Sequence, residues 1–128
     1  MERVPGLGGL FFKAENPEAL YAWYEKHLGI KRGPEGAVSF IWREINDKAK
    51  AGRTVWTIFP QETAHFQPSR ASFMMNSPVA DLDGLLKALK EEGVEVNARR
   101  EDYDYGRFAW IMDPEANRDE LWEPPAGT

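Results

Sequence analysis

The hydrophobic and polar positions near the end of the chain follow the pattern of a β-hairpin. Residues 108–112 (FAWIM) are an aromatic and apolar run of strand length. Residues 113–117 (DPEAN) interrupt it, because Pro presets φ and because Asp and Asn bond local backbone groups. Residues 118–123 then alternate with a period of two, which places Glu120 and Trp122 on one face. The predicted hairpin therefore holds one carboxylate beside an indole ring.

Two other segments have the spacing of amphipathic helices. The first begins at Asn16, an N-cap that is followed by proline, and ends at Gly29. The second begins at Asp81 and ends at Gly93. Apolar side chains recur three or four residues apart in both segments. They are Leu20, Trp23, Tyr24 and Leu28 in the first, and Leu82, Leu85, Leu86 and Leu89 in the second.

Strand-length runs flank both predicted helices. We expect strands over residues 6–14, 30–33, 37–45 and 54–59, and again over 71–76, 94–96, 108–112 and 118–123, with a charged loop over 98–104. The order β-α-β-β-β thus occurs twice. The fold class is therefore α+β, and the two units must share a core or a cleft. We expect one domain over residues 1–128, with module one at about 6–60, a crossover at about 61–70 and module two at about 71–124.

Composition narrows the class of partner. The chain has 128 residues, a net charge of −5 and no clustered basic patch, which argues against nucleic acid. No apolar run approaches the roughly 18 residues of a membrane span, and the N-terminus lacks the pattern of a secretion signal. The chain has no cysteine, which excludes disulfides and cysteine–metal sites. These features predict a cytoplasmic protein.

Two segments resemble the vicinal oxygen chelate superfamily, which includes glyoxalases, bleomycin-resistance proteins and extradiol dioxygenases. They are WYEKHLG (residues 23–29) and DPEANRDEL (residues 113–121), within a repeat that covers nearly the whole chain. The resemblance implies that the two modules curl into an incomplete barrel. It also implies a divalent metal such as Zn, Ni, Fe or Mn in the concavity, held by about four His or Glu side chains, and a homodimer.

The ligand positions of that superfamily are mostly lost here. Glu120 falls on the ligand position of the last strand. The other three positions fall on residues that cannot hold a hard cation: Gly9, Phe73 or Met74, and Trp56 or Thr57. We therefore expect no metal. Ala116 also stands where the superfamily has Gly in the turn, which would cost roughly 1 kcal/mol at a positive φ.

The favoured function is binding of a small aromatic or polar organic molecule in a concave aromatic cleft. Glu120 would act there as a relic ligand, a general base or an acceptor for a cationic ligand, or would merely pair with Arg118 or Arg107. We expect the cleft to be lined by Trp42, Trp56, Phe73, Trp110, Trp122, Tyr105 and Arg107. The tryptophans could instead be core and dimer-interface residues.

The alternative is a metal-dependent glyoxalase-like lyase or isomerase, or a dioxygenase, with non-standard ligands. Glu120 with His65 is the pair that such a site would use. His65 lies in the irregular crossover, however, and is otherwise expected to be a solvent-facing loop residue. His27 lies in the last turn of the first helix, where the helix dipole favours a positive charge.

Overall fold

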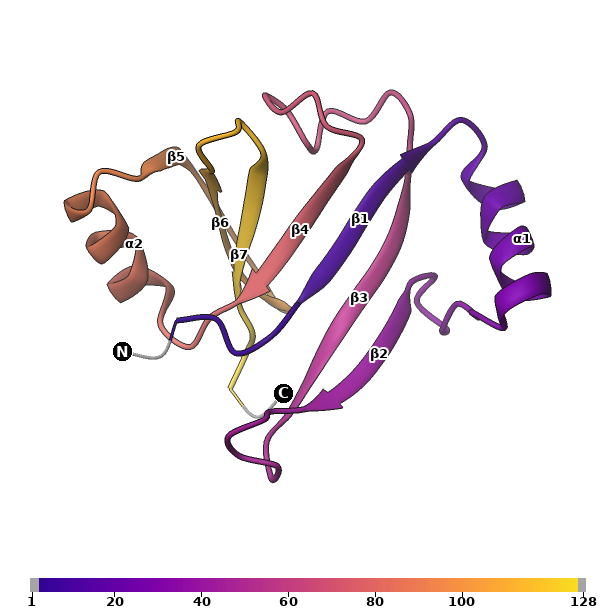
Figure 1. Cartoon of the computed structure of the whole chain (residues 1–128), viewed down its shortest axis with the longest axis horizontal. Coiled ribbons are helices and arrows are strands. Elements are labelled where there is room, and N and C mark those ends of the chain that lie inside the picture. The colour runs from indigo at the N-terminus through magenta and orange to yellow at the C-terminus, as the bar shows by residue number, and fades with distance from the viewer. Residues whose placement is uncertain (1–2, 127–128) are drawn as a thin grey trace.

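The structure is a computed structural model that describes residues 3–126. Residues 1–2 and 127–128, at the ends of the predicted domain over residues 1–128, lie outside the described part. Within that part, seven strands form one curved sheet in the order β2-β3-β1-β4-β7-β6-β5, flanked by two helices (Figure 1). The sheet is not closed, because β2 and β5 remain as its edges. The element bounds are β1 Gly9–Ala14, α1 Pro17–Leu28, β2 Val38–Arg43, β3 Ala51–Pro60, β4 Phe73–Pro78, α2 Leu82–Glu91, β5 Glu95–Tyr103, β6 Gly106–Met112 and β7 Arg118–Glu123.

The two halves of the chain meet at the antiparallel pair of β1 and β4. On either side of this pair the order repeats, since β1 pairs in parallel with β3 and β4 pairs in parallel with β7. The α+β class predicted from the duplicated pattern and the incomplete barrel implied by the resemblance are both confirmed. One detail differs: residues 30–33 form no strand, so the first half has three strands. Ile30 instead packs against the cluster around Trp56.

Both helices begin and end where capping chemistry predicts. The side chain of Asn16 accepts a hydrogen bond from the backbone N–H of Ala19 (3.1 Å), and Gly29 ends α1 with φ +69°. The side chain of Asp81 accepts from the backbone N–H of Gly84 (3.0 Å) at the start of α2. Capping is local, which is why the sequence is sufficient to locate it.

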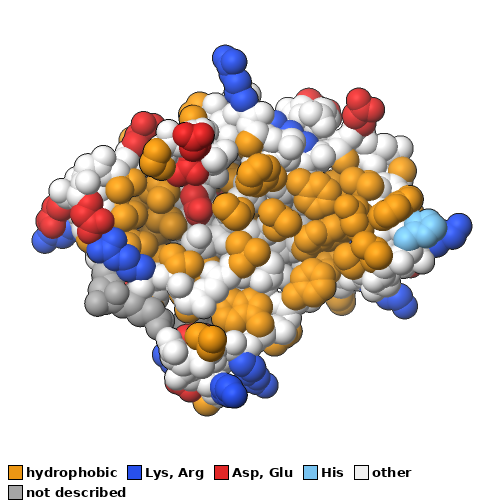
Figure 2. Space-filling model, viewed as in Figure 1, with side chains coloured by type: hydrophobic (Ala, Val, Ile, Leu, Met, Phe, Trp, Pro, Cys, Tyr) orange, Lys and Arg blue, Asp and Glu red, His pale blue; other side chains and the backbone are white. Residues whose placement is uncertain are grey.

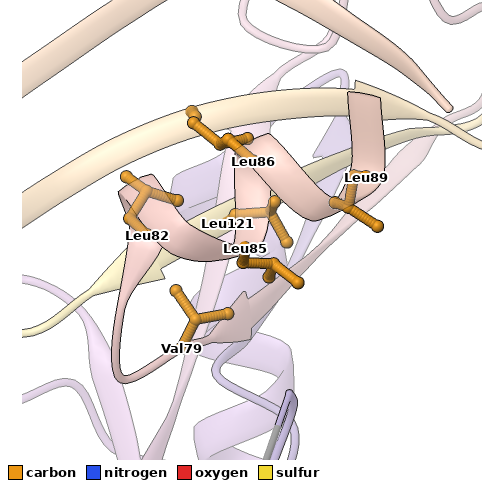
Figure 3. Packing of buried hydrophobic residues seen from close by; sticks show 7 residues of the cluster. Val79, Leu82, Leu85, Leu86, Leu89 and Leu121 are labelled. Carbon is orange, nitrogen blue, oxygen red and sulfur yellow. The ribbon is translucent and has the colours of Figure 1, made fainter. Parts of the chain in front are cut away.

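The two helices differ in how they pack on the outer face of the sheet. Helix α2 buries its leucines against Val79, Ala109 and Leu121 (Figure 3). Helix α1 buries no residue fully; Leu20, Tyr21 and Tyr24 lie half-buried against a cluster that includes Trp56. The first helix is therefore the less covered of the two.

The strand β5 is longer than expected. It continues through the charged segment predicted as a loop, with an irregularity between Val96 and Arg100. The reason is non-local: residues 100–103 pair with residues 106–109 of β6, and this pairing compensates for a polar sequence. In the described part of the chain, no helix is long and apolar enough to cross a membrane.

Candidate functional site

The concave side of the sheet encloses a cavity of about 540 Å³. Its walls come from all seven strands and from the crossover between the two halves, so neither half forms it alone. Six of its side chains are aromatic rings from the strands: Phe11, Phe59, Tyr103, Phe108, Trp110 and Trp122. Its size and its mixture of many apolar and few polar groups are typical of small-molecule sites.

Glu120 lies at the floor of this cavity and is only 4% exposed. Strand register places it between Asn76 of β4 and Trp110 of β6. The side-chain amide of Asn76 donates to its Oε1 (2.7 Å), and the indole N–H of Trp110 donates to its Oε2 (3.0 Å). His65 Nε2 lies 3.1 Å from the same Oε2. Three nitrogen atoms therefore surround one buried carboxylate.

His65 reaches Glu120 because the crossover is tied down at this point. The guanidinium of Arg118, on the same face of β7 as Glu120, donates to the backbone carbonyl of His65. The imidazole stacks on the ring of Phe59 (centroids 5.3 Å apart, planes at 3°) and meets Trp110 edge-on at 6.3 Å. The prediction that His65 is a solvent-facing loop residue is wrong, because these contacts turn its ring into the cavity.

Arg118 supports the site from beneath. It is buried, and its guanidinium lies 4.7 Å from the centroid of the Trp110 ring. Burial lowers the pKa of Arg118, an effect that the nearby charge of Glu120 opposes. The predicted direct pairing of Glu120 with Arg118 or Arg107 is replaced by the three nitrogen contacts, because Arg118 bonds the crossover and Arg107 pairs with Asp83 on the outer face.

Two glycines allow the backbone of the chain to approach Asn76 closely. A Cβ on Gly8 would stand 2.3 Å from Asn76 Oδ1, and a Cβ on Gly9 would stand 3.0 Å from Asn76 Cβ. Asn76 Oδ1 itself is buried and has no hydrogen-bond partner within the described residues. The register joins Gly9, Asn76 and Glu120 across three neighbouring strands. The floor therefore has an unsatisfied acceptor, Asn76 Oδ1, between the positions 9 and 120 at which the resemblance would place metal ligands.

The predicted cleft residues divide into two groups. Trp110, Trp122 and Tyr105 line the cavity that contains Glu120. Trp42 lines a second cavity of about 420 Å³, which shares Trp122 and Tyr105 with the first. The remaining three residues, Trp56, Phe73 and Arg107, lie on the outer face, so their placement in the cleft is corrected.

Strand alternation is the reason for this division. Within β3, Thr57 faces the cavity, so its neighbour Trp56 points outward into the cluster beneath α1. Within β4, Met74 is buried beside Phe11 and Trp110, so Phe73 is outward and exposed. The sequence shows that side chains alternate between the two faces of each strand. Which set of side chains faces the cavity depends on which face of the strand is buried in the folded chain.

Comparisons with solved structures identify the fold. A variant of methylmalonyl-CoA epimerase from Streptomyces coelicolor, in complex with 2-nitronate-propionyl-CoA, is similar at a TM-score of 0.68 and 13% identity, over 96% of this chain and 99% of that chain. This chain has the vicinal oxygen chelate fold. The epimerase from Mycobacterium tuberculosis is similar at 0.60 and 19% identity, over 94% and 89% of the two chains.

The fold alone does not assign an activity. An NAD-dependent benzaldehyde dehydrogenase from Legionella pneumophila is also similar, at a TM-score of 0.56 and 14% identity, over 91% of this chain and 97% of that chain. No protein-family model and no curated protein matches the sequence. Because one fold hosts several chemistries, function must be argued from the residues of the cavity.

The cavity residues do not fit a typical metal site. Glu120 and His65 are adjacent, but no group of three or more His, Cys, Asp or Glu side chains that could hold a metal ion occurs in the described part of the chain. Catalytic metal sites generally use three protein ligands. Two atoms of the Glu120 carboxylate also already face N–H donors. The donor set is therefore better suited to hydrogen bonding than to holding a divalent ion.

Proposed function

We propose that this chain binds a small aromatic or polar organic molecule in the concave cavity, without a metal. The observation that carries the proposal is Glu120, a buried carboxylate held by Asn76, Trp110 and His65 at the floor of an aromatic-walled cavity. A fixed polar group beneath apolar walls orients a ligand, while the walls supply most of the contact area. Phe108 and Trp122, which are only partly buried, offer flat surfaces on which a ring can stack.

The floor favours a ligand with a hydrogen-bond donor at one end. A carboxylate offers about four lone-pair sites, and the contacts of Glu120 use one on Oε1 and up to two on Oε2. Oε1 therefore keeps a free position, and Oδ1 of the neighbouring Asn76 also has no partner in the described structure. An amine or hydroxyl would supply what these acceptors lack, whereas a second carboxylate would be repelled.

Matched probes test this proposal. We expect 2-naphthylmethylamine to quench tryptophan fluorescence and to raise the melting temperature, and 2-naphthoate to bind at least about tenfold more weakly, since hydrogen bonds to charged groups contribute about 1.5–3 kcal/mol. Glu120→Gln should remove this preference. Glu115→Gln, an exposed carboxylate in the turn before β7, is the control and should leave binding unchanged. Equal binding to the wild type and to Glu120→Gln would overturn the proposal, as would a failure of both probes to bind.

One contact favours a second candidate, the metal-dependent lyase, isomerase or dioxygenase. His65 Nε2 and Glu120 Oε2 lie 3.1 Å apart, and these two residues are the pair that the sequence analysis proposes for a metal site. Elemental analysis of the purified protein distinguishes the two candidates. Stoichiometric Zn, Ni, Fe or Mn that disappears in both Glu120→Ala and His65→Ala would establish the metal site and overturn metal-free binding. A melting temperature that does not respond to divalent ions in any of the three proteins would remove this candidate.

A further inference from the structure

The cavity above Glu120 adjoins the second cavity at a shared boundary. Arg53 of β3, Tyr105 of the turn between β5 and β6, and Trp122 of β7 line both cavities. The indole N–H of Trp122 donates to the backbone carbonyl of Tyr105 (2.8 Å), which holds this ring at the boundary. The volumes of about 540 Å³ and about 420 Å³ are each sufficient for a small molecule. A ligand held at Glu120 therefore has room to extend past Trp122 into the second cavity.

Strand register places Arg53 on the side of Glu120 that leads to the second cavity. Glu120 lies in one cross-strand row with Asn76, Gly9 and Val55. Strands β1 and β3 are parallel to each other, and β4 and β7 run in the opposite direction. Arg53, two residues before this row on β3, and Trp122, two residues after it on β7, therefore lie at the same end of the sheet. The offset from the row is about 7 Å along the strands.

The guanidinium of Arg53 has no partner in the part of the chain that the structure describes, and the residue is exposed. By contrast, Arg100 and Arg107 both pair with Asp83 on the outer face. Among the described arginines, Arg53 alone lines either cavity. A guanidinium presents a planar fork of N–H donors that matches a carboxylate or a phosphate. Arg53 therefore offers an unused anion-binding group at the boundary.

The surroundings of Arg53 are basic, although the chain as a whole has a net charge of −5. Residues 43–53 contain four basic and two acidic side chains. The basic ones are Arg43, Lys48, Lys50 and Arg53, and the acidic ones are Glu44 and Asp47. Lys and Arg side chains gather at the connection between β2 and β3, at the bottom of the view in Figure 2. Lys50 also lines the second cavity. The local charge at this end of the sheet therefore favours an anion.

Besides Glu120, four carboxylates line the two cavities, and none of them is paired with Arg53. They are Glu44 and Asp104 in the second cavity, and Glu35 and Glu101 in the first. Glu101 already accepts a hydrogen bond from the hydroxyl of Tyr103 (2.5 Å) and pairs with Arg99. The other three are exposed or half-buried, where water and salt screen their charges. The fork of Arg53 thus stays available to a ligand.

We propose that Arg53 and the second cavity receive the anionic end of an elongated ligand whose other end donates a hydrogen bond to Glu120. This inference rests on the proposed function and adds a ligand class: an aromatic molecule with an amine or hydroxyl at one end and a carboxylate or phosphate at the other. The rings of Phe108 and Trp122 lie between the two ends, with their planes at 12°. Because Arg53 is exposed, its contact contributes less than the buried one at Glu120. An anion without a donor, such as 2-naphthoate, therefore still binds more weakly than the amine.

Three naphthalene probes test this inference by tryptophan fluorescence. They are 2-naphthylmethylamine, 6-(aminomethyl)-2-naphthoate and the methyl ester of the latter, which keeps the shape and removes the charge. We expect the wild type to bind the acid at least about threefold more tightly than the ester. Arg53→Gln should abolish this preference, and Arg53→Lys, which keeps the charge, should retain part of it. Arg43→Gln removes a charge from the same basic segment at a position that lines neither cavity, so this control should keep the preference.

Failure of this inference is distinguishable from failure of the proposed function. If the wild type binds the acid no more tightly than the ester, while Glu120→Gln still weakens binding of 2-naphthylmethylamine, the anionic subsite is overturned and the proposed function stands. A preference for the acid that persists in Arg53→Gln would also overturn the subsite, because the anion would then be held elsewhere. If none of the three probes binds to the wild type, both the subsite and the proposed function are overturned.

Discussion

Asp119 should destabilise the folded protein at neutral pH. Its carboxyl lies half-buried on the outer face of β7, 3.2 Å from the hydroxyl of Ser77. Burial is the main cause that raises its pKa from 3.8 to about 6; the charges of Asp113 and Glu120 add to this, and the Ser77 hydrogen bond opposes it. Because the folded-state pKa lies above the unfolded value, the contribution to stability is full below about pH 4 and is lost as the pH rises through about 6.

The size of this effect follows from the shift. A difference of about 2 pKa units corresponds to at most about 3 kcal/mol at pH 7, and solvent screening of a half-buried group reduces this to about 1–2 kcal/mol. Asp119→Asn keeps the shape and removes the charge. We therefore expect the variant to be more stable than the wild type by about 1–2 kcal/mol at pH 7.5 and to differ little at pH 4.

Urea denaturation at both pH values and at one protein concentration measures the effect. A fixed concentration keeps any dependence on self-association out of the comparison. Asp104→Asn, at an exposed position, is the control and should change the free energy of unfolding by less than about 0.5 kcal/mol. A stabilisation by Asp119→Asn that is the same at pH 4 and pH 7.5, or that is absent at both, would refute the assignment of the cost to a buried charge.

Three further changes probe the turn, the helices and the crossover. Ala116 has φ +64°, so Ala116→Gly should raise the free energy of unfolding by about 1 kcal/mol; an unchanged urea midpoint would contradict this. Leu85→Ala should cost about 2–5 kcal/mol, and Leu20→Ala, on the half-covered helix, less than half as much; equal losses would show that both helices are packed alike. Arg118→Met frees the carbonyl of His65 and should cost about 1–3 kcal/mol. It should also shift the imidazole NMR signals of His65, and unshifted signals would argue against the role of Arg118 in positioning the ring.

The elements that depend on local chemistry could be predicted from the sequence. Asn16 and Asp81 begin helices because their side chains bond backbone groups three residues later. The turn before β7 follows from Asp113, whose carboxylate accepts the backbone N–H groups of Glu115 and Asn117 and whose pKa these bonds lower. Each of these contacts spans at most four residues, so a short segment determines it.

The contacts that span the chain could not be predicted in the same way. His65 is 55 residues from Glu120 and lies in a segment without periodicity. Its position depends on the bond from Arg118 to its carbonyl and on the ring of Phe59, neither of which leaves a local pattern. The orientation of Trp56 and Phe73 could not be predicted from the local sequence either. Both side chains point outward because of which face of their strands is buried.

The position of Glu120 and its chemical environment are determined by different parts of the chain. The register of β7 with β4 and β6 fixes where the carboxylate lies. What it can do depends on Asn76, Trp110 and His65, which come from three other segments. The amide N–H of Asn76 and the indole N–H of Trp110 each occupy a lone pair of the carboxylate that a metal would otherwise use. In the proposed function, the same contacts leave this carboxylate able to accept a hydrogen bond from an organic ligand.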